Sequence, residues 1–124
     1  MSRSLIDTSA WIHFLRPKGD GEARARVEAA LRDGSACWCA MVRLELWNGA
    51  AGEPEKRALR RLEAVLPDLE IGREVWREAH TLARAARTAG VTVPATDLLI
   101  AACAAHHGAE VVHADRDFDR LSAL

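Results

Sequence analysis

Ser4-Leu5-Ile6-Asp7-Thr8-Ser9 decides how this chain folds, because a short apolar run ends there at a carboxylate followed by two hydroxyl side chains. A run of this kind is typical of a strand that is buried on both faces of a parallel sheet. The same arrangement recurs near the C-terminus, in Val111-Val112-His113-Ala114-Asp115. The two stretches therefore predict two strands of one sheet, each followed by an acid.

Two further runs, Ala36 to Cys39 and Leu69 to Ile71, are also short and apolar, and helical patterns separate all four. The clearest helical pattern covers Arg73 to Ala89, where apolar residues recur at the spacing of one helix face and Gly90 follows as a stop signal. The stretch from Asp97 to His107 is apolar on nearly every side and predicts a buried helix. Strands alternating with helices indicate an α/β fold with a parallel sheet.

The composition predicts one ordinary domain over residues 1–124. Of the 124 residues, 49% are hydrophobic, and a chain of this length buries roughly two-thirds of the surface that it exposes when unfolded. The formal net charge of -1 is not the basic surplus of a protein that binds nucleic acid through electrostatics alone. A nucleic-acid substrate is still compatible with the composition, since Arg heavily outnumbers Lys and suits bidentate phosphate contacts.

The cysteines and the N-terminal stretch predict a cytoplasmic protein without membrane association. Cys37, Cys39 and Cys103 are an odd number in a chain with no secretory leader, which favours a reducing compartment. The first apolar stretch is broken by Asp7 and His13 and is too short for a transmembrane span. Buried thiols are the expected state of the cysteines, and a metal site at the first two is the alternative.

Four carboxylates stand where an unpaired charge is costly, because two follow predicted strands and two lie in apolar helical stretches. They are Asp7, Glu45, Asp97 and Asp115. Charged groups are rarely buried without a partner or a metal. In an open parallel sheet the carboxyl ends of the strands and the starts of the following helices share one edge. We therefore expect the four acids to converge in one crevice at that edge.

Four neighbouring carboxylates need a cation. Two unit charges ~4 Å apart repel by about 4 kcal/mol at an effective dielectric constant near 20. Carboxylate oxygens suit Mg²⁺ or Mn²⁺ better than Zn²⁺, which usually takes His or Cys. Such ions hold a phosphodiester and lower the pKa of an attacking water. The acids therefore predict hydrolysis of a phosphate ester.

The motifs around these acids resemble the PIN domain family and, within it, the VapC-type toxins of bacterial toxin-antitoxin pairs. The matching stretches span nearly the whole chain and are Leu5–Ile12, Val42–Gly49, Asp97–Ala104, His107–Ala109 and His113–Phe118. The resemblance implies a Rossmann-like parallel sheet of four to five strands with helices on both faces. It also implies an endoribonuclease that depends on Mg²⁺ or Mn²⁺, a homodimer, and a cognate antitoxin that inhibits it.

The resemblance assigns roles to single residues. The metal-binding acids that it implies are Asp7, Glu45, Asp97 and Asp115. Ser9 matches a small polar residue that supports the first acid. His113 stands where many relatives have Thr, so the resemblance does not carry over a hydroxyl contact at this position. Asp117 is a second acid close to Asp115. Three roles are open for Asp117: it binds the metal, it orients water from the outer shell, or it favours the start of the last helix.

These side chains also have plainer structural interpretations. Asp is a preferred helix N-cap, a role open to Asp7, Asp97 and Asp115, and Glu45 could pair with an Arg. Three arginines have two possible roles: they flank the crevice and contact phosphates, or they are ion-paired at the surface. They are Arg43, Arg116 and Arg120. The tryptophans also have two possible roles: they stack RNA bases, or they pack in the core and the dimer interface. They are Trp11, Trp38, Trp47 and Trp76.

The leading hypothesis is a metal-dependent endoribonuclease that cuts single-stranded or looped RNA with water as the nucleophile. A metal-dependent phosphatase on a related α/β scaffold is the first alternative. Aspartyl-phosphate enzymes of the common type have a second Asp two places after the first, where this chain has Ser9. The second alternative is a non-catalytic PIN dimer whose acidic pocket receives a basic segment of a partner.

Overall fold

The computed structural model describes residues 2–124, so Met1, which the expected domain includes, lies outside the described residues. The elements in chain order are β1 (Ser4–Ile6), α1 (Thr8–Leu15), α2 (Gly21–Asp33), β2 (Ala36–Cys37), α3 (Ala40–Asn48), α4 (Gly52–Val65), α5 (Arg73–Thr88), α6 (Ala95–His107), β3 (Glu110–Val112) and α7 (Arg116–Ser122). The strands are parallel and separated by helices, which confirms the α/β class.

The sheet is parallel and has β1 at its centre, in the order β2-β1-β3. The register pairs Leu5 with Cys37 on one side and with Val111 on the other. Leu5 and Ile6 are fully buried, as a central strand covered on both faces requires. The chain first adds β2 on one side of β1 and later adds β3 on the other. The strand order therefore reverses beside β1, where ligands bind in open α/β sheets.

The expected number of four to five strands is wrong, since residues 2–124 form three strands. The run Leu69–Ile71 is not a strand, and its neighbourhood contributes an isolated bridge between Trp38 and Asp68. Pro67 has no N–H to donate, so the pairing does not extend from this bridge toward the N-terminal side of Asp68. β2 ends at Cys37, two residues before the predicted end, and Cys39 is already the N-cap of α3.

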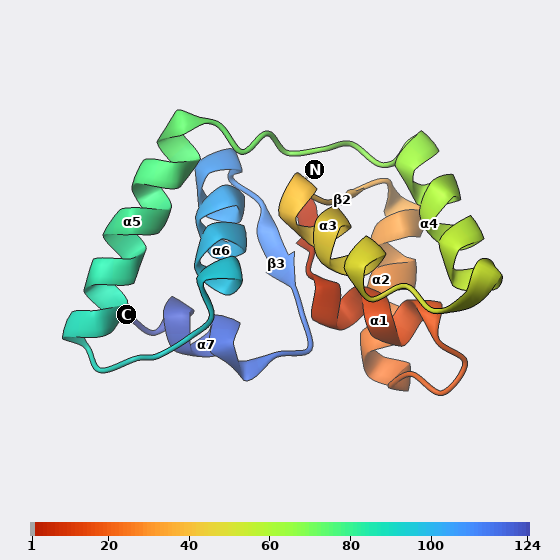
Figure 1. The fold of residues 1–124 in the computed structure, drawn as a ribbon, viewed down its shortest axis with the longest axis horizontal. Coiled ribbons are helices and arrows are strands. Elements are labelled where there is room, and N and C mark those ends of the chain that lie inside the picture. Colours follow the sequence, from red (N-terminus) through yellow and green to blue (C-terminus); the bar gives the residue numbers. More distant parts are fainter. Residues whose placement is uncertain (1) are drawn as a thin grey trace.

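In Figure 1, α5, α6 and α7 lie next to β3, whereas α1, α2 and α4 lie toward β2. Among them, α6 contacts β3, α3, α5 and α7. Leu99, Ile100 and Cys103 of this helix are buried, which confirms the predicted burial of the stretch. Because α6 is held from several directions, it provides a rigid support for the acid in its first turn.

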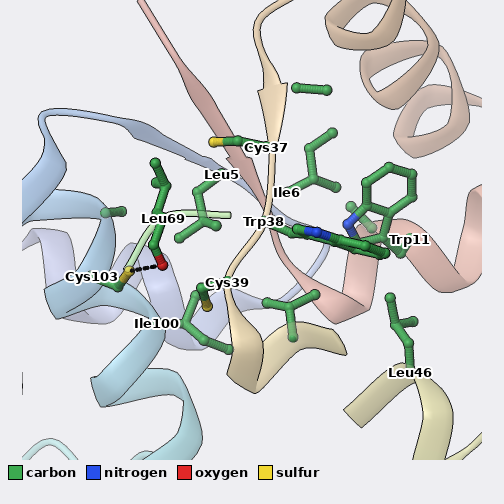
Figure 2. Close-up of a cluster of buried hydrophobic side chains, with 14 of the residues drawn as sticks. Leu5, Ile6, Trp11, Cys37, Trp38, Cys39, Leu46, Leu69, Ile100 and Cys103 are labelled. Atoms are coloured by element: carbon green, nitrogen blue, oxygen red, sulfur yellow. Dashed lines mark hydrogen bonds between the residues drawn. The ribbon is translucent and has the colours of Figure 1, made fainter. Parts of the chain in front are cut away.

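The core is built around two tryptophans. Trp11 and Trp38 are almost completely buried, and their ring centroids lie 5.9 Å apart with the planes inclined by 60° (Figure 2). The core interpretation is therefore confirmed for these two. Trp76 is 49% exposed on α5 and does not belong to this core.

The cysteines are buried free thiols. Burial raises the pKa of Cys37 to about 11, so this group is a neutral thiol near neutral pH. Cys103 Sγ donates to the Leu69 carbonyl at 3.7 Å (Figure 2). The plain interpretation of the cysteines as core residues is confirmed.

Candidate metal centre

Asp7 stands at the carboxyl end of β1, where it is the N-cap of α1. Its Oδ2 atom accepts from the backbone N–H of Ser9 at 3.0 Å and from the Ser9 hydroxyl at 2.6 Å. The side chain is 3% exposed, and its Oδ1 atom has no hydrogen-bond partner within residues 2–124. A buried carboxylate oxygen without a donor is costly. The capping role therefore occupies one oxygen and leaves the other free for a cation.

Three acids from the last third of the chain form a compact cluster. One oxygen from each of Asp97, Asp115 and Asp117 lies within 4.8 Å of the other two. Asp97 is buried in the first turn of α6, whose N-cap is Pro94, so its N-cap interpretation is wrong. Asp97 Oδ2 has no hydrogen-bond partner in the described part of the chain. Like Asp7, this acid presents a buried, unsatisfied oxygen.

Asp117 contributes one of the three carboxylates of this cluster. Asp115 caps α7 by accepting from the Asp117 backbone N–H at 2.9 Å, which places both carboxylates at the start of that helix. The sequence places Asp117 near Asp115 but leaves open which way its side chain points. One oxygen of Asp117 thus lies within 4.8 Å of an oxygen of Asp97 and of Asp115, and Asp117 also pairs with Arg120 at 3.4 Å.

Glu45 joins the site through Thr8. It lies in α3, and its Oε1 atom accepts from the Thr8 hydroxyl at 2.8 Å. Burial raises the pKa of Glu45, the Thr8 hydrogen bond lowers it in part, and the charge of Asp7 raises it further. The ion pairs of residues 2–124 do not include Glu45. The sequence analysis did not predict that Thr8 binds Glu45. The position of Thr8 directly after Asp7 could have indicated that it lies at the site.

The pKa of Asp97 is raised strongly by its surroundings. Burial, followed by the charges of Asp7, Asp115 and Asp117, raises the pKa of Asp97 to about 7. A carboxyl in this environment takes up a proton near neutral pH unless a cation neutralises its surroundings. The donors are all carboxylate oxygens, two of them unsatisfied. The residues present therefore fit a hard divalent cation such as Mg²⁺ or Mn²⁺.

Ser9 connects the two halves of the site. Its hydroxyl donates to Asp7 Oδ2 at 2.6 Å and accepts from the Ala114 backbone N–H at 2.9 Å. The end of β1 is thereby tied to the loop that carries Asp115. The expected supporting role of Ser9 thus has a concrete basis in these two hydrogen bonds.

We expect Ser9→Ala to lower the free energy of unfolding by about 1–2 kcal/mol, because both hydrogen bonds are lost and the Ala114 N–H loses its acceptor. Ser9→Thr retains a hydroxyl and should recover most of this loss. Urea denaturation of the metal-free proteins measures the difference. Equal stability of Ser9→Ala and the unchanged protein would contradict the bridging role.

His113 lies in the loop between β3 and α7, two residues before Asp115. Its Nδ1 atom accepts from the Asp115 backbone N–H at 3.2 Å, and its Nε2 atom lies 3.5 Å from Asp119. The ring also packs against Phe118, with centroids 5.1 Å apart. An acceptor nitrogen therefore holds the backbone of Asp115 in this chain.

The three candidate arginines have different surroundings. Arg43 pairs with Asp68 at 2.9 Å, which confirms its ion-paired interpretation. Arg120 Nη1 lies 3.4 Å from Asp117 Oδ1, so it reaches the acid cluster. Arg116 is exposed at the first position of α7, directly after Asp115.

The comparisons with known proteins agree with this geometry. Residues 4–124 match the PIN domain family. Ribonuclease VapC11 of Mycobacterium tuberculosis is 39% identical over 124 residues, which cover 97% of this chain and 92% of that protein. The chain belongs to the PIN domain family, in its VapC branch.

Other relatives of this PIN domain agree in sequence and in fold. Ribonuclease VapC18 of Mycobacterium tuberculosis is 35% identical, with 96% of this chain and 87% of that protein covered. The DNA-bound VapBC structure from Salmonella typhimurium has a TM-score of 0.76 at 22% identity, covering 98% of this chain and 93% of that chain. FitAcB from Neisseria gonorrhoeae has a TM-score of 0.71 at 24% identity, covering 96% and 93%. These structures confirm the fold that the resemblance implies.

None of the helices in residues 2–124 of this PIN domain combines the length and the apolar character that crossing a bilayer requires.

Proposed function

We propose that this VapC-family PIN domain is a metal-dependent endoribonuclease. The observation that carries the proposal is the carboxylate cluster, in which oxygens of Asp97, Asp115 and Asp117 lie within 4.8 Å of one another. The buried oxygens of Asp7 and Asp97 that lack hydrogen-bond partners within residues 2–124 would also be stabilised by a cation. The VapC11 relative at 39% identity is named a ribonuclease.

In this proposal Asp97, Asp115 and Asp117 hold Mg²⁺, for which Mn²⁺ substitutes, and Asp7 adds a further carboxylate. The bound ion supplies positive charge for the phosphate and lowers the pKa of the attacking water. Thr8 fixes one oxygen of Glu45, which leaves the other to orient that water. Ser9 keeps Asp7 in position.

We infer further that the protein is the toxin of a toxin-antitoxin pair and acts in the cytoplasm as a homodimer. Its similar solved structures include VapBC-1 from nontypeable Haemophilus influenzae, with a TM-score of 0.73 at 18% identity. At this identity the likeness supports the fold alone, so the inference depends on the VapC relatives. The substrate is RNA and the partner is a cognate antitoxin that inhibits cleavage.

A cleavage assay tests the proposal. Structured RNA with single-stranded loops should be cut internally in Mg²⁺, and chelation by EDTA should stop the reaction until Mn²⁺ is added. Glu45→Gln should slow cleavage by about 100-fold or more, because it removes a charge preorganised at the reacting centre. Glu28→Gln is the matched control, since Glu28 is exposed on α2.

Equal cleavage with EDTA and with Mg²⁺ would refute the metal dependence. Equal rates for Glu45→Gln and Glu28→Gln would remove Glu45 from the site. Hydrolysis of a small phosphomonoester without cleavage of RNA would instead support the phosphatase alternative.

A further inference from the structure

A hollow of about 310 Å³ lies directly beside the candidate metal centre. Its wall combines residues of α2, of the loop that follows β3 and of α7. Asp115 belongs both to this wall and to the acid cluster, so the hollow and the metal centre share a side chain. A polyanion that occupies the metal centre can therefore continue into the hollow.

Two guanidinium groups line the hollow. Arg26 reaches across from α2, and its Nη2 atom donates to the His113 carbonyl at 2.7 Å. Arg116 lines it from the first position of α7 and forms no side-chain hydrogen bond or ion pair within residues 2–124. The ion pairs of the described chain do not include Arg26 either. Both cations are thus free of carboxylate partners although acids are close by.

Carboxylates in the same wall affect whether an anion can bind in the hollow. Glu22 lies one helical turn before Arg26, and Asp119 is 3.5 Å from His113 Nε2. These carboxylates and Asp115 oppose an anion in the metal-free protein. With a divalent cation bound at the centre, the charge of Asp115 would be neutralised, and the two arginines would then favour an anion in the hollow.

We propose that Arg26 and Arg116 bind a backbone phosphate of the RNA strand, next to the phosphate that is hydrolysed. This subsite rests on the proposed ribonuclease function. Guanidinium groups form charge-assisted, often bidentate hydrogen bonds with phosphate oxygens. An RNA strand fits better than a free anion, because one chain of phosphates engages the metal centre and the adjoining hollow together.

The test measures binding separately from cleavage. A labelled single-stranded RNA is titrated with the Glu45→Gln protein in Mg²⁺, and fluorescence anisotropy is followed at several salt concentrations. Arg26→Gln and Arg116→Gln should each weaken binding by about three- to tenfold. Each should also reduce the slope of log affinity against log salt concentration by about 0.7. Glu22→Gln should have the opposite effect and strengthen binding.

Matched variants separate binding from folding. Arg32→Gln removes an exposed arginine from the same helix as Arg26 and should leave binding unchanged. Arg26→Lys keeps the charge and should retain more affinity than Arg26→Gln. Arg116→Gln breaks no side-chain hydrogen bond or ion pair within residues 2–124, so its thermal melting curve should match that of the parent protein.

Binding by Arg26→Gln and Arg116→Gln that equals binding by Arg32→Gln would overturn the subsite, whether or not the unchanged protein cleaves RNA. Displacement of the RNA by millimolar inorganic phosphate would also overturn it, because the hollow would then be a site for free anions. Arginine-dependent RNA binding by a protein that never cleaves RNA would support the subsite and refute the ribonuclease.

Discussion

Asp97→Asn should abolish RNA cleavage and at the same time make the metal-free protein more stable. The loss of activity follows because Asp97 contributes an oxygen to the carboxylate cluster, and we expect a decrease of at least about 100-fold. The gain in stability follows because asparagine relieves the repulsion from Asp7, Asp115 and Asp117. Opposite changes in activity and stability are the mark of a residue kept for function.

The gain in stability depends on pH in a defined direction. The pKa of Asp97 rises from the model-compound value of 3.8 to about 7 in the folded protein. The folded state therefore holds the proton more tightly, and the contribution of Asp97 to stability is present below pH 3.8 and is lost as the pH rises toward 7. At pH 8 the variant should exceed the unchanged protein by about 1–3 kcal/mol, since solvent screening reduces the full effect of the shift.

Thermal melting between about pH 4 and pH 8, with and without Mn²⁺, measures both effects. Mn²⁺ should stabilise the unchanged protein by ~2.7 kcal/mol at one hundred times its dissociation constant. The increase should shrink in Asp97→Asn and persist in Glu28→Gln. A metal-free Asp97→Asn protein that is clearly less stable than its parent would show that Asp97 has a structural hydrogen-bonding role instead.

Trp11→Ala should cause the largest loss of stability, a decrease of about 3–5 kcal/mol in the free energy of unfolding. Trp11 is fully buried between Phe14, at a centroid distance of 5.8 Å, and Trp38, at 5.9 Å. Its removal leaves a cavity beside the helix that Asp7 caps, so metal affinity should fall as well. Urea denaturation measures the change.

Two further variants define the cause. Trp11→Phe should cost much less than Trp11→Ala, because it keeps an aromatic ring and removes the indole N–H, which has no partner within residues 2–124. Trp76→Ala should cost little, since Trp76 is 49% exposed. A loss in Trp11→Ala no larger than in Trp76→Ala would contradict the central role of this ring.

Local patterns account for the parts of the site that depend on single elements. Asp7 and Asp115 follow apolar runs that form β1 and the strand beside it, and both cap the helices that begin there. Asp97 lies in the first turn of a buried helix, as the apolar sequence around it predicts. Strand ends and helix starts are encoded by neighbouring residues, so the sequence can place these acids at one edge.

The sheet shows where local pattern stops being informative. The run Leu69–Ile71 is predicted as a strand, but the pairing there is reduced to the bridge between Trp38 and Asp68. The last strand begins one residue before the predicted Val111. Strand length depends on which partner is available across the sheet, and composition does not specify that partner.

By itself, the sequence determined the α/β class and the placement of Asp7, Asp97 and Asp115 at strand ends and at the start of a helix, because apolar periodicity and charge in an apolar stretch are local signals. Only the tertiary structure decided that Asp117 shares the cluster and that Arg26 contacts the carbonyl of a residue 87 positions away. Such contacts depend on side-chain directions and on packing between distant elements. Those are properties of the folded chain as a whole, which no short stretch of residues contains.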